Sequence, residues 1–90
     1  MKYTVLWLPD AEQRLASIWI EANQREAITK AANEIDELLK HNPYEHSESR
    51  EKGRRIIFSS PLGAVIRVNE EDNTVTVINV WKFQDRSSSQ

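Results

Sequence analysis

Apolar and polar residues alternate near the start of the chain and then recur at helical spacing. Residues 3–8 alternate so that a tyrosine, a valine and a tryptophan share one face, which is typical of a strand with one buried side. Pro9 ends this pattern, because the residue before a proline is held extended and proline suits the first turn of a helix. Two amphipathic helices are therefore predicted over residues 9–23 and 24–42, each with one apolar stripe.

The second half of the chain shows three strand-like runs separated by turn residues. These runs cover residues 54–59, 64–69 and 74–83. Short turns at 60–63 and 70–73 join them, which predicts a three-strand antiparallel meander. The preceding connection, residues 43–53, is polar and has no periodicity. A connection of this length is expected to be either functional or mobile.

The order of these elements predicts an α+β fold. The strand at residues 3–8 has no strand beside it in the sequence, so its partner must lie in the second half of the chain. The predicted order is β-α-α-β-β-β, with the helical hairpin packed on one face of a small, mainly antiparallel four-stranded sheet. Residues 1–83 form a single domain in this prediction, and the polar tail 84–90 is expected to be flexible.

Composition restricts the chemistry and the location. The chain has no cysteine, which removes disulfides and thiolate chemistry together. No run approaches the ~20 apolar residues of a membrane-spanning helix, and no charged-then-apolar leader precedes the first strand, so a cytoplasmic location is expected. The formal net charge is −2, which argues against non-specific electrostatic binding of nucleic acid.

Basic side chains nevertheless crowd together at residues 50–55. The candidates for binding an anion or a target are Arg50, Lys52, Arg54, Arg55, Arg67, Trp81 and Lys82. Arginine suits phosphate because its guanidinium donates two parallel hydrogen bonds, which favours Arg55 and Arg67. A solvated surface explains each basic residue equally well. Trp7 and Trp19 lie in apolar stripes and are predicted to be core residues, whereas Trp81 fits either a core or an interface.

Four segments together resemble the RelE/ParE superfamily of toxins from toxin–antitoxin pairs. They are YTVLWLPDAEQRLASIW near the start, AITKAANEIDELLKHNP in the second helix, GRRIIFSSPLGAVIRV and the closing TVTVINVWKF. The resemblance covers residues 3–83, and it implies the same strand, helical hairpin and three-strand meander that the pattern predicts.

This resemblance implies two activities and one partner. RelE-like members cleave mRNA on the ribosome with a metal-free set of arginines, lysines and often a tyrosine or histidine. ParE-like members lack those groups and act on DNA gyrase. Both kinds are held inactive by an antitoxin whose extended and helical segments wrap the toxin. The implied partners are therefore a cognate antitoxin and either gyrase or the ribosome, with no membrane.

The residues that the family uses for cleavage are mostly missing. The arginine expected at the start of the penultimate strand falls at Gly63-Ala64, and the one expected after the last strand falls at Phe83. No tyrosine follows Tyr44, and His41 and His46 lie outside the predicted strands. The remaining candidates for catalysis are Arg54, Arg55, Arg67 and Lys82.

The favoured interpretation is a toxin that binds its target without cutting mRNA. One alternative is a non-toxic binding module of the same fold that works by homodimer or hetero-association. Another is a metal-independent endoribonuclease of the RelE kind. None of these interpretations requires a cofactor, and two histidines without a third ligand predict no metal site.

Overall fold

Two helices and five strands make up the computed structural model, which describes residues 2–83. In chain order they are β1 (Thr4–Trp7), α1 (Pro9–Glu21), α2 (Arg25–His41), β2 (Ser47–Ser49), the short 3₁₀ turn η1 (Glu51–Gly53), β3 (Arg54–Ser59), β4 (Leu62–Asn69) and β5 (Thr74–Lys82). The predicted tail at 84–90 lies outside the described residues.

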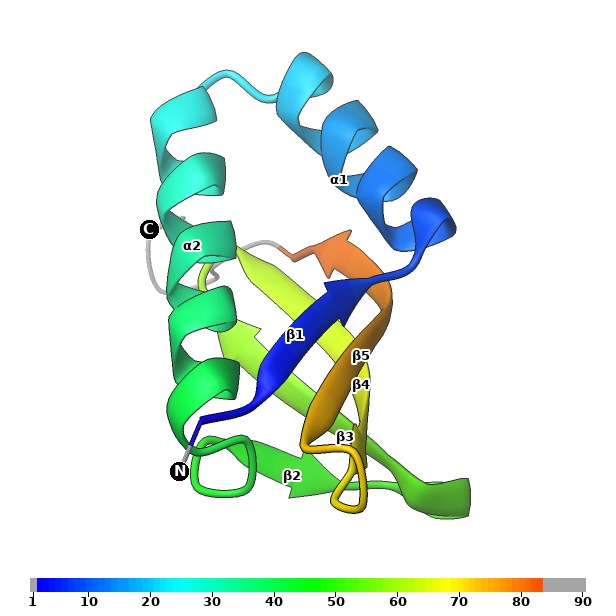
Figure 1. The fold of residues 1–90 in the computed structure, drawn as a ribbon. Coiled ribbons are helices and arrows are strands. Elements are labelled where there is room, and N and C mark those ends of the chain that lie inside the picture. The colour runs from blue at the N-terminus through cyan, green and yellow to red at the C-terminus, as the bar shows by residue number, and fades with distance from the viewer. Residues whose placement is uncertain (1, 84–90) are drawn as a thin grey trace.

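The first strand completes the sheet formed by the second half of the chain (Figure 1). The strands are ordered β1-β5-β4-β3-β2. β1 runs parallel to β5, with Val5 opposite Val75, and the other neighbours are antiparallel. This arrangement confirms the predicted α+β fold and the predicted pairing of the first strand with a late one.

The sheet has one strand more than the four predicted. The additional strand, β2, lies within the 43–53 connection and pairs with β3, placing Glu48 opposite Ile56. Its residues are polar and show no alternation of apolar and polar side chains, so no periodic signal marks it. Backbone hydrogen bonds to β3 order it as a short edge strand. β4 also begins two residues earlier than predicted, at Leu62, which leaves only Ser60 and Pro61 in the turn.

One face of the sheet and one face of α2 form the core. In α2, buried residues recur at three- and four-residue steps, as expected for the inner face of a helix. An irregularity between Val65 and Ile66 leaves Ile78 as an extra residue in β5, so Val77 and Val80 both reach the core. The buried core residues are Ala11, Ile28, Ala31, Ile35, Leu39, Ile57, Leu62, Ala64, Ile66, Val75, Val77 and Val80.

The first helix is packed less completely than the sequence predicts. α1 leans on β5 whereas α2 lies over β1, β3 and β4, and the two helices spread apart from each other (Figure 1). Only Ala11 of α1 is buried. Trp19 is 40% exposed, so its predicted place in the core is wrong, while Trp7 is half-buried and packs against the core. Neither described helix is long and apolar enough to cross a membrane.

Candidate functional site

Two arginines face each other across adjacent strands on the side of the sheet away from the helices, here called the open face. Arg54 of β3 lies opposite Arg67 of β4, and both are exposed. Arg67 lies on the open face because its neighbour Ile66 points into the core and side chains alternate along a strand. Like charges directly opposite each other disfavour the pairing. Within residues 2–83 neither guanidinium forms an ion pair, so the two charges remain available to an anion.

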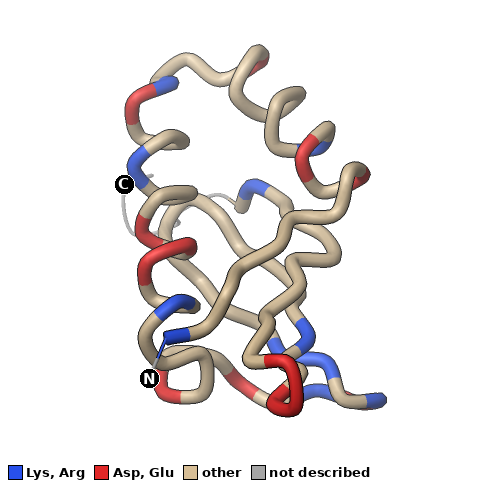
Figure 2. Tube along the Cα trace, viewed as in Figure 1, with Lys and Arg blue, Asp and Glu red and all other residues tan. Residues whose placement is uncertain are grey.

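The connection between β2 and β3 adds two more cations to this pair. The Arg50 amide donates to the Arg54 carbonyl at 2.7 Å, and Nη2 of Arg67 donates to the Lys52 carbonyl at 3.3 Å. Lys52 has a left-handed backbone conformation (φ 63°), which closes the connection tightly. Arg50 also forms an ion pair with Glu48 at 3.2 Å. We call Arg50, Lys52, Arg54 and Arg67 the basic cluster. Figure 2 shows Lys and Arg gathered at the lower right, beside the acidic β4–β5 turn.

An aromatic group occupies the other end of the open face. Trp81 lies opposite Gly63, and Phe58 lies on the other side of that glycine. The Phe58 ring meets the rings of Trp81 and Phe83 edge to face, with centroids 6.1 and 5.7 Å apart. A Cβ atom on Gly63 would lie 2.6 Å from the Trp81 ring, so the glycine is what allows the ring to pack this closely against the strand. We call Phe58, Trp81 and Phe83 the aromatic shelf.

The two features lie along the same strand. Gly63, which marks the aromatic shelf, and Arg67, which marks the basic cluster, are four residues apart on β4, about 13 Å at the rise of a strand. The cross-strand pair of Ile56 and Val65, both half-buried, lies between them. The open face therefore presents cations at one end and aromatic rings at the other.

Arg55 and Lys82 lie on the opposite side of the sheet from the basic cluster. Arg55 donates through Nε to Ser47 Oγ at 2.6 Å and through Nη2 to the Ser47 carbonyl at 2.9 Å. Its guanidinium also covers the Tyr44 ring at 5.0 Å. These contacts fix the connection between α2 and β2. Lys82 lies opposite Leu62 on the helix side, so the seven predicted residues divide between two faces.

The groups that most often move protons lie away from the open face. His41 ends α2 and lies 3.4 Å from Glu37, and His46 lies in the α2–β2 connection. Tyr44 donates its hydroxyl hydrogen to Glu70 at 2.7 Å, and this hydrogen bond raises the pKa of Tyr44 to about 12. The tyrosine therefore stays protonated at neutral pH. Among residues 2–83, no three metal-ligating side chains are grouped closely enough to hold an ion.

The sequence did not single out Phe58 and Gly63 as parts of the site. A glycine inside a strand is a recognised sign of a close approach by another group. The sequence pattern places Gly63 in the predicted turn 60–63, so this signal becomes readable only once the structure shows that β4 begins at Leu62.

Comparisons with known proteins identify the fold. A chain of the RelBE2 toxin–antitoxin complex from Mycobacterium tuberculosis is 19% identical, with a TM-score of 0.76 over 94% of this chain and 95% of that one. A chain of the P. aeruginosa ParDE system is 16% identical, with a TM-score of 0.69 over 92% and 98%. The isolated E. coli RelE toxin is 24% identical, with a TM-score of 0.57 over 92% and 86%.

Neither a family model nor a curated protein matches the amino-acid sequence. The structural likeness nevertheless extends over nearly the whole chain and includes both RelE-type and ParE-type systems. The chain therefore has the fold of the RelE/ParE toxins of toxin–antitoxin systems.

Proposed function

We propose that this chain is the toxin of a type II toxin–antitoxin module and acts by binding its target through the open face, without cutting mRNA. The observation that carries the proposal is the cross-strand pair of Arg54 and Arg67, two like charges without an ion pair in the described residues. An acidic group on a target would relieve their repulsion and form charge-assisted hydrogen bonds with both. The fold shared with the isolated E. coli RelE toxin and with chains of the RelBE2 and ParDE systems supports the assignment to this class.

The chemistry of the open face favours binding over cleavage. Cleavage of RNA next to a 2′-hydroxyl needs a base and an acid whose pKa values lie near the working pH. Arginine stays charged in proteins, so it stabilises an anion but does not exchange a proton at neutral pH. The basic cluster therefore suits recognition of a carboxylate or phosphate, and the aromatic shelf suits an apolar group about 13 Å away along β4.

The partner in this proposal is a cognate antitoxin encoded beside the chain. The structural neighbours include RelBE and ParDE systems, which supports a partner of this class. Among ParE-like toxins the target is DNA gyrase, and gyrase is the first candidate here. A cytoplasmic location belongs to the same proposal.

Growth arrest on induced expression tests the function. Strong expression of soluble protein should stop growth while ribosome-bound mRNA stays intact, and co-expression of the neighbouring antitoxin should restore growth. The double variant Arg54→Ala/Arg67→Ala should fold normally and no longer arrest growth. Lys82→Ala is the matched control, because it removes a cation from the other face of the sheet.

Three results would each change the conclusion. Normal growth despite abundant soluble protein, together with recovery of a stable partner, would favour a non-toxic binding module. Equal toxicity of the double variant would remove the open face from the mechanism. Ribosome-dependent mRNA cleavage that is lost in Arg67→Ala would assign the chain to the ribonucleases.

A further inference from the structure

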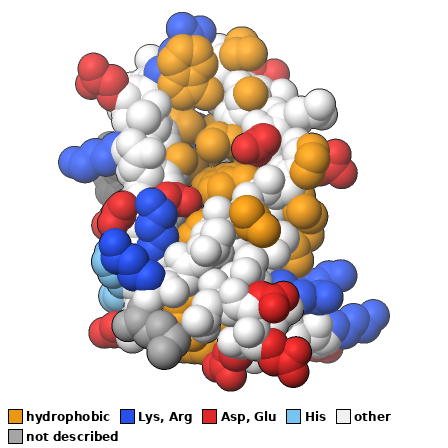
Figure 3. Space-filling model, viewed as in Figure 1, with side chains coloured by type: hydrophobic (Ala, Val, Ile, Leu, Met, Phe, Trp, Pro, Cys, Tyr) orange, Lys and Arg blue, Asp and Glu red, His pale blue; other side chains and the backbone are white. Residues whose placement is uncertain are grey.

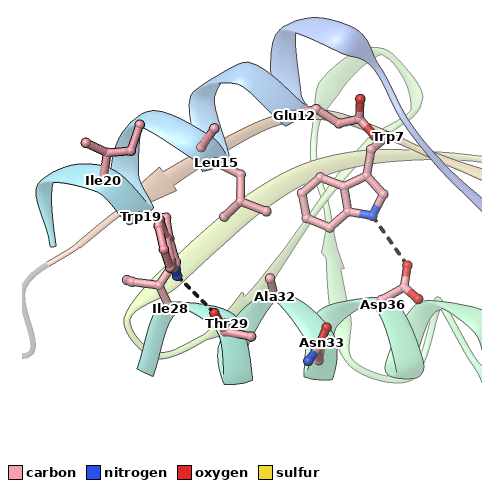
Figure 4. A pocket seen from close by; sticks show the side chains of 11 residues that line it. Trp7, Glu12, Leu15, Trp19, Ile20, Ile28, Thr29, Ala32, Asn33 and Asp36 are labelled. Atoms are coloured by element: carbon pink, nitrogen blue, oxygen red, sulfur yellow. Dashed lines mark hydrogen bonds between the residues drawn. The ribbon is translucent and has the colours of Figure 1, made fainter. Parts of the chain in front are cut away.

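A large apolar groove separates the two helices. Its volume is about 720 Å³. The apolar side chains that line it include Trp7, Leu15, Trp19, Ile20, Ile28 and Ala32. Figure 3 shows the hollow between the helices with hydrophobic side chains at its floor. Figure 4 shows Trp7 of β1 and Leu15 and Trp19 of α1 pointing towards α2, while Ile20 points away from it at the rim.

Specific contacts between the two helices fix one wall of the groove. Nε1 of Trp19 donates to Thr29 Oγ1 at 3.1 Å, which fixes the indole between the helices. Arg25 covers the Trp19 ring at 4.7 Å and donates to the carbonyls of Trp19 and Ile20 at the end of α1. The groove is therefore a formed feature that the helices do not close by themselves.

The same region presents large apolar side chains to solvent. Ile20 is 62% exposed at the rim, next to the 40% exposed Trp19. A domain of about this size buries only about two-thirds of its unfolded surface, so covering such residues would add stability that it lacks. The surface thus has both an exposed apolar side chain, Ile20, and an apolar groove into which the same side chain of a second copy could fit.

The charges at the two ends of the groove are complementary. At the end near β1, the charged lining residues are Glu12 and Asp36, and Asp36 is paired with Lys40 at 3.2 Å. At the other end, the charged lining residues of a smaller adjoining hollow are Arg25, Lys30 and Glu26. One end is therefore acidic and the other carries a net positive charge. Glu12 and Lys30 form no ion pair within residues 2–83.

We propose that the groove is an interface between two copies of this chain, related by a two-fold axis that sets the grooves antiparallel. A two-fold interface needs a patch that is complementary to itself. Antiparallel grooves meet this requirement, because Ile20 of each copy enters the hollow of the other and Lys30 approaches the other copy's Glu12. The open face stays free, so this inference does not depend on the proposed function.

Sedimentation equilibrium over a broad range of protein concentration tests the interface. The wild-type chain should associate into a dimer, and Ile20→Lys should remain monomeric. Ile20 is exposed and lies at the end of α1, where a cation is favoured, so this variant is expected to fold. An unchanged far-UV spectrum checks that it does. Phe58→Lys on the open face is the matched control and should dimerise like the wild type.

A charge exchange tests the orientation independently. Glu12→Lys and Lys30→Glu should each weaken the dimer several-fold, and the double variant should recover most of the loss because the pair is restored with its signs exchanged. A wild-type chain that is monomeric throughout would overturn the proposal. A dimer that persists in Ile20→Lys would also overturn it. So would a double variant in which the losses of dimer affinity from the two single substitutions simply add. A monomer whose binding of the co-expressed antitoxin is lost in Ile20→Lys would assign the groove to the antitoxin instead.

Discussion

A methyl group added at Gly63 tests whether the aromatic shelf is built on this glycine. The Cβ of Gly63→Ala would lie 2.6 and 2.7 Å from two carbons of the Trp81 ring and 3.1 Å from the Phe58 ring. Carbon atoms in favourable contact lie about 3.5–4.0 Å apart, so the indole has to move by roughly 1 Å. The aromatic shelf would be displaced together with it.

The expected cost combines two opposing terms. Overpacking of this kind costs about 1–3 kcal/mol. Replacing a strand glycine by alanine gains about 0.5–1 kcal/mol, because the unfolded chain loses conformational freedom. The net loss therefore lies between about 0 and 2.5 kcal/mol and centres near 1 kcal/mol. At about 4–8 °C per kcal/mol for a domain of this size, the central value should lower Tm measurably.

A double-mutant cycle with Trp81→Ala isolates the contact. In the Trp81→Ala background the ring is absent, so Gly63→Ala should be neutral or stabilising by up to ~1 kcal/mol. The coupling energy between the two positions, measured by urea unfolding, should be about 1–3 kcal/mol. A coupling energy near zero would refute the reasoning, because the added methyl would then cost the same with or without the indole.

Three further changes have defined outcomes. Arg55→Ala should lower the free energy of unfolding in urea by about 1.5–3 kcal/mol, because it removes charged hydrogen bonds. Its neighbour in sequence, Arg54, lies on the open face, and Arg54→Ala should change this free energy by no more than about 0.5 kcal/mol. Equal losses would contradict the assignment of Arg55 to the structural contacts. The hydrogen bond to Glu70 raises the pKa of Tyr44 to about 12. The stabilisation of the fold by this hydrogen bond is therefore complete below the pKa of an unfolded tyrosine, about 10, and is lost as pH rises through about 12. Tyrosinate absorbance should show this shift, and Glu70→Ala should remove most of it, since the hydrogen bond to Glu70 is the largest of its causes. Lys52→Gly should raise the urea midpoint slightly, because a left-handed residue with a side chain costs about 1–2 kcal/mol, and a lower midpoint would contradict that estimate.

The order and type of most elements could be predicted from the sequence. Alternation over residues 3–8 and the apolar stripe of α2 reflect local geometry, which a periodic pattern records directly. Pro9 and the turn residues located the ends of elements for the same reason. β2 escaped prediction because a three-residue polar edge strand has no period of its own and is ordered only by the backbone of β3.

The candidate residues could be found in the sequence, but their grouping could not. Alternation alone separates Arg54 from its neighbour Arg55, yet it does not say which of the two faces the helices cover. The pairing of Arg54 with Arg67 depends on the β3–β4 register, which the two-residue turn at Ser60 and Pro61 sets. The sequence shows which residues are cations, whereas the β3–β4 register determines that Arg54 and Arg67 lie opposite each other.

The sequence by itself determined the α+β class and the succession of helices and strands, because hydrophobic periodicity acts over a few residues. Only the tertiary structure decided that Trp19 is exposed beside a groove, that Arg55 supports the α2–β2 connection and that the aromatic shelf rests on Gly63. Each of these depends on where two distant segments meet and at what angle. Contacts of that kind are set by the packing of whole elements, and no local pattern of residues contains them.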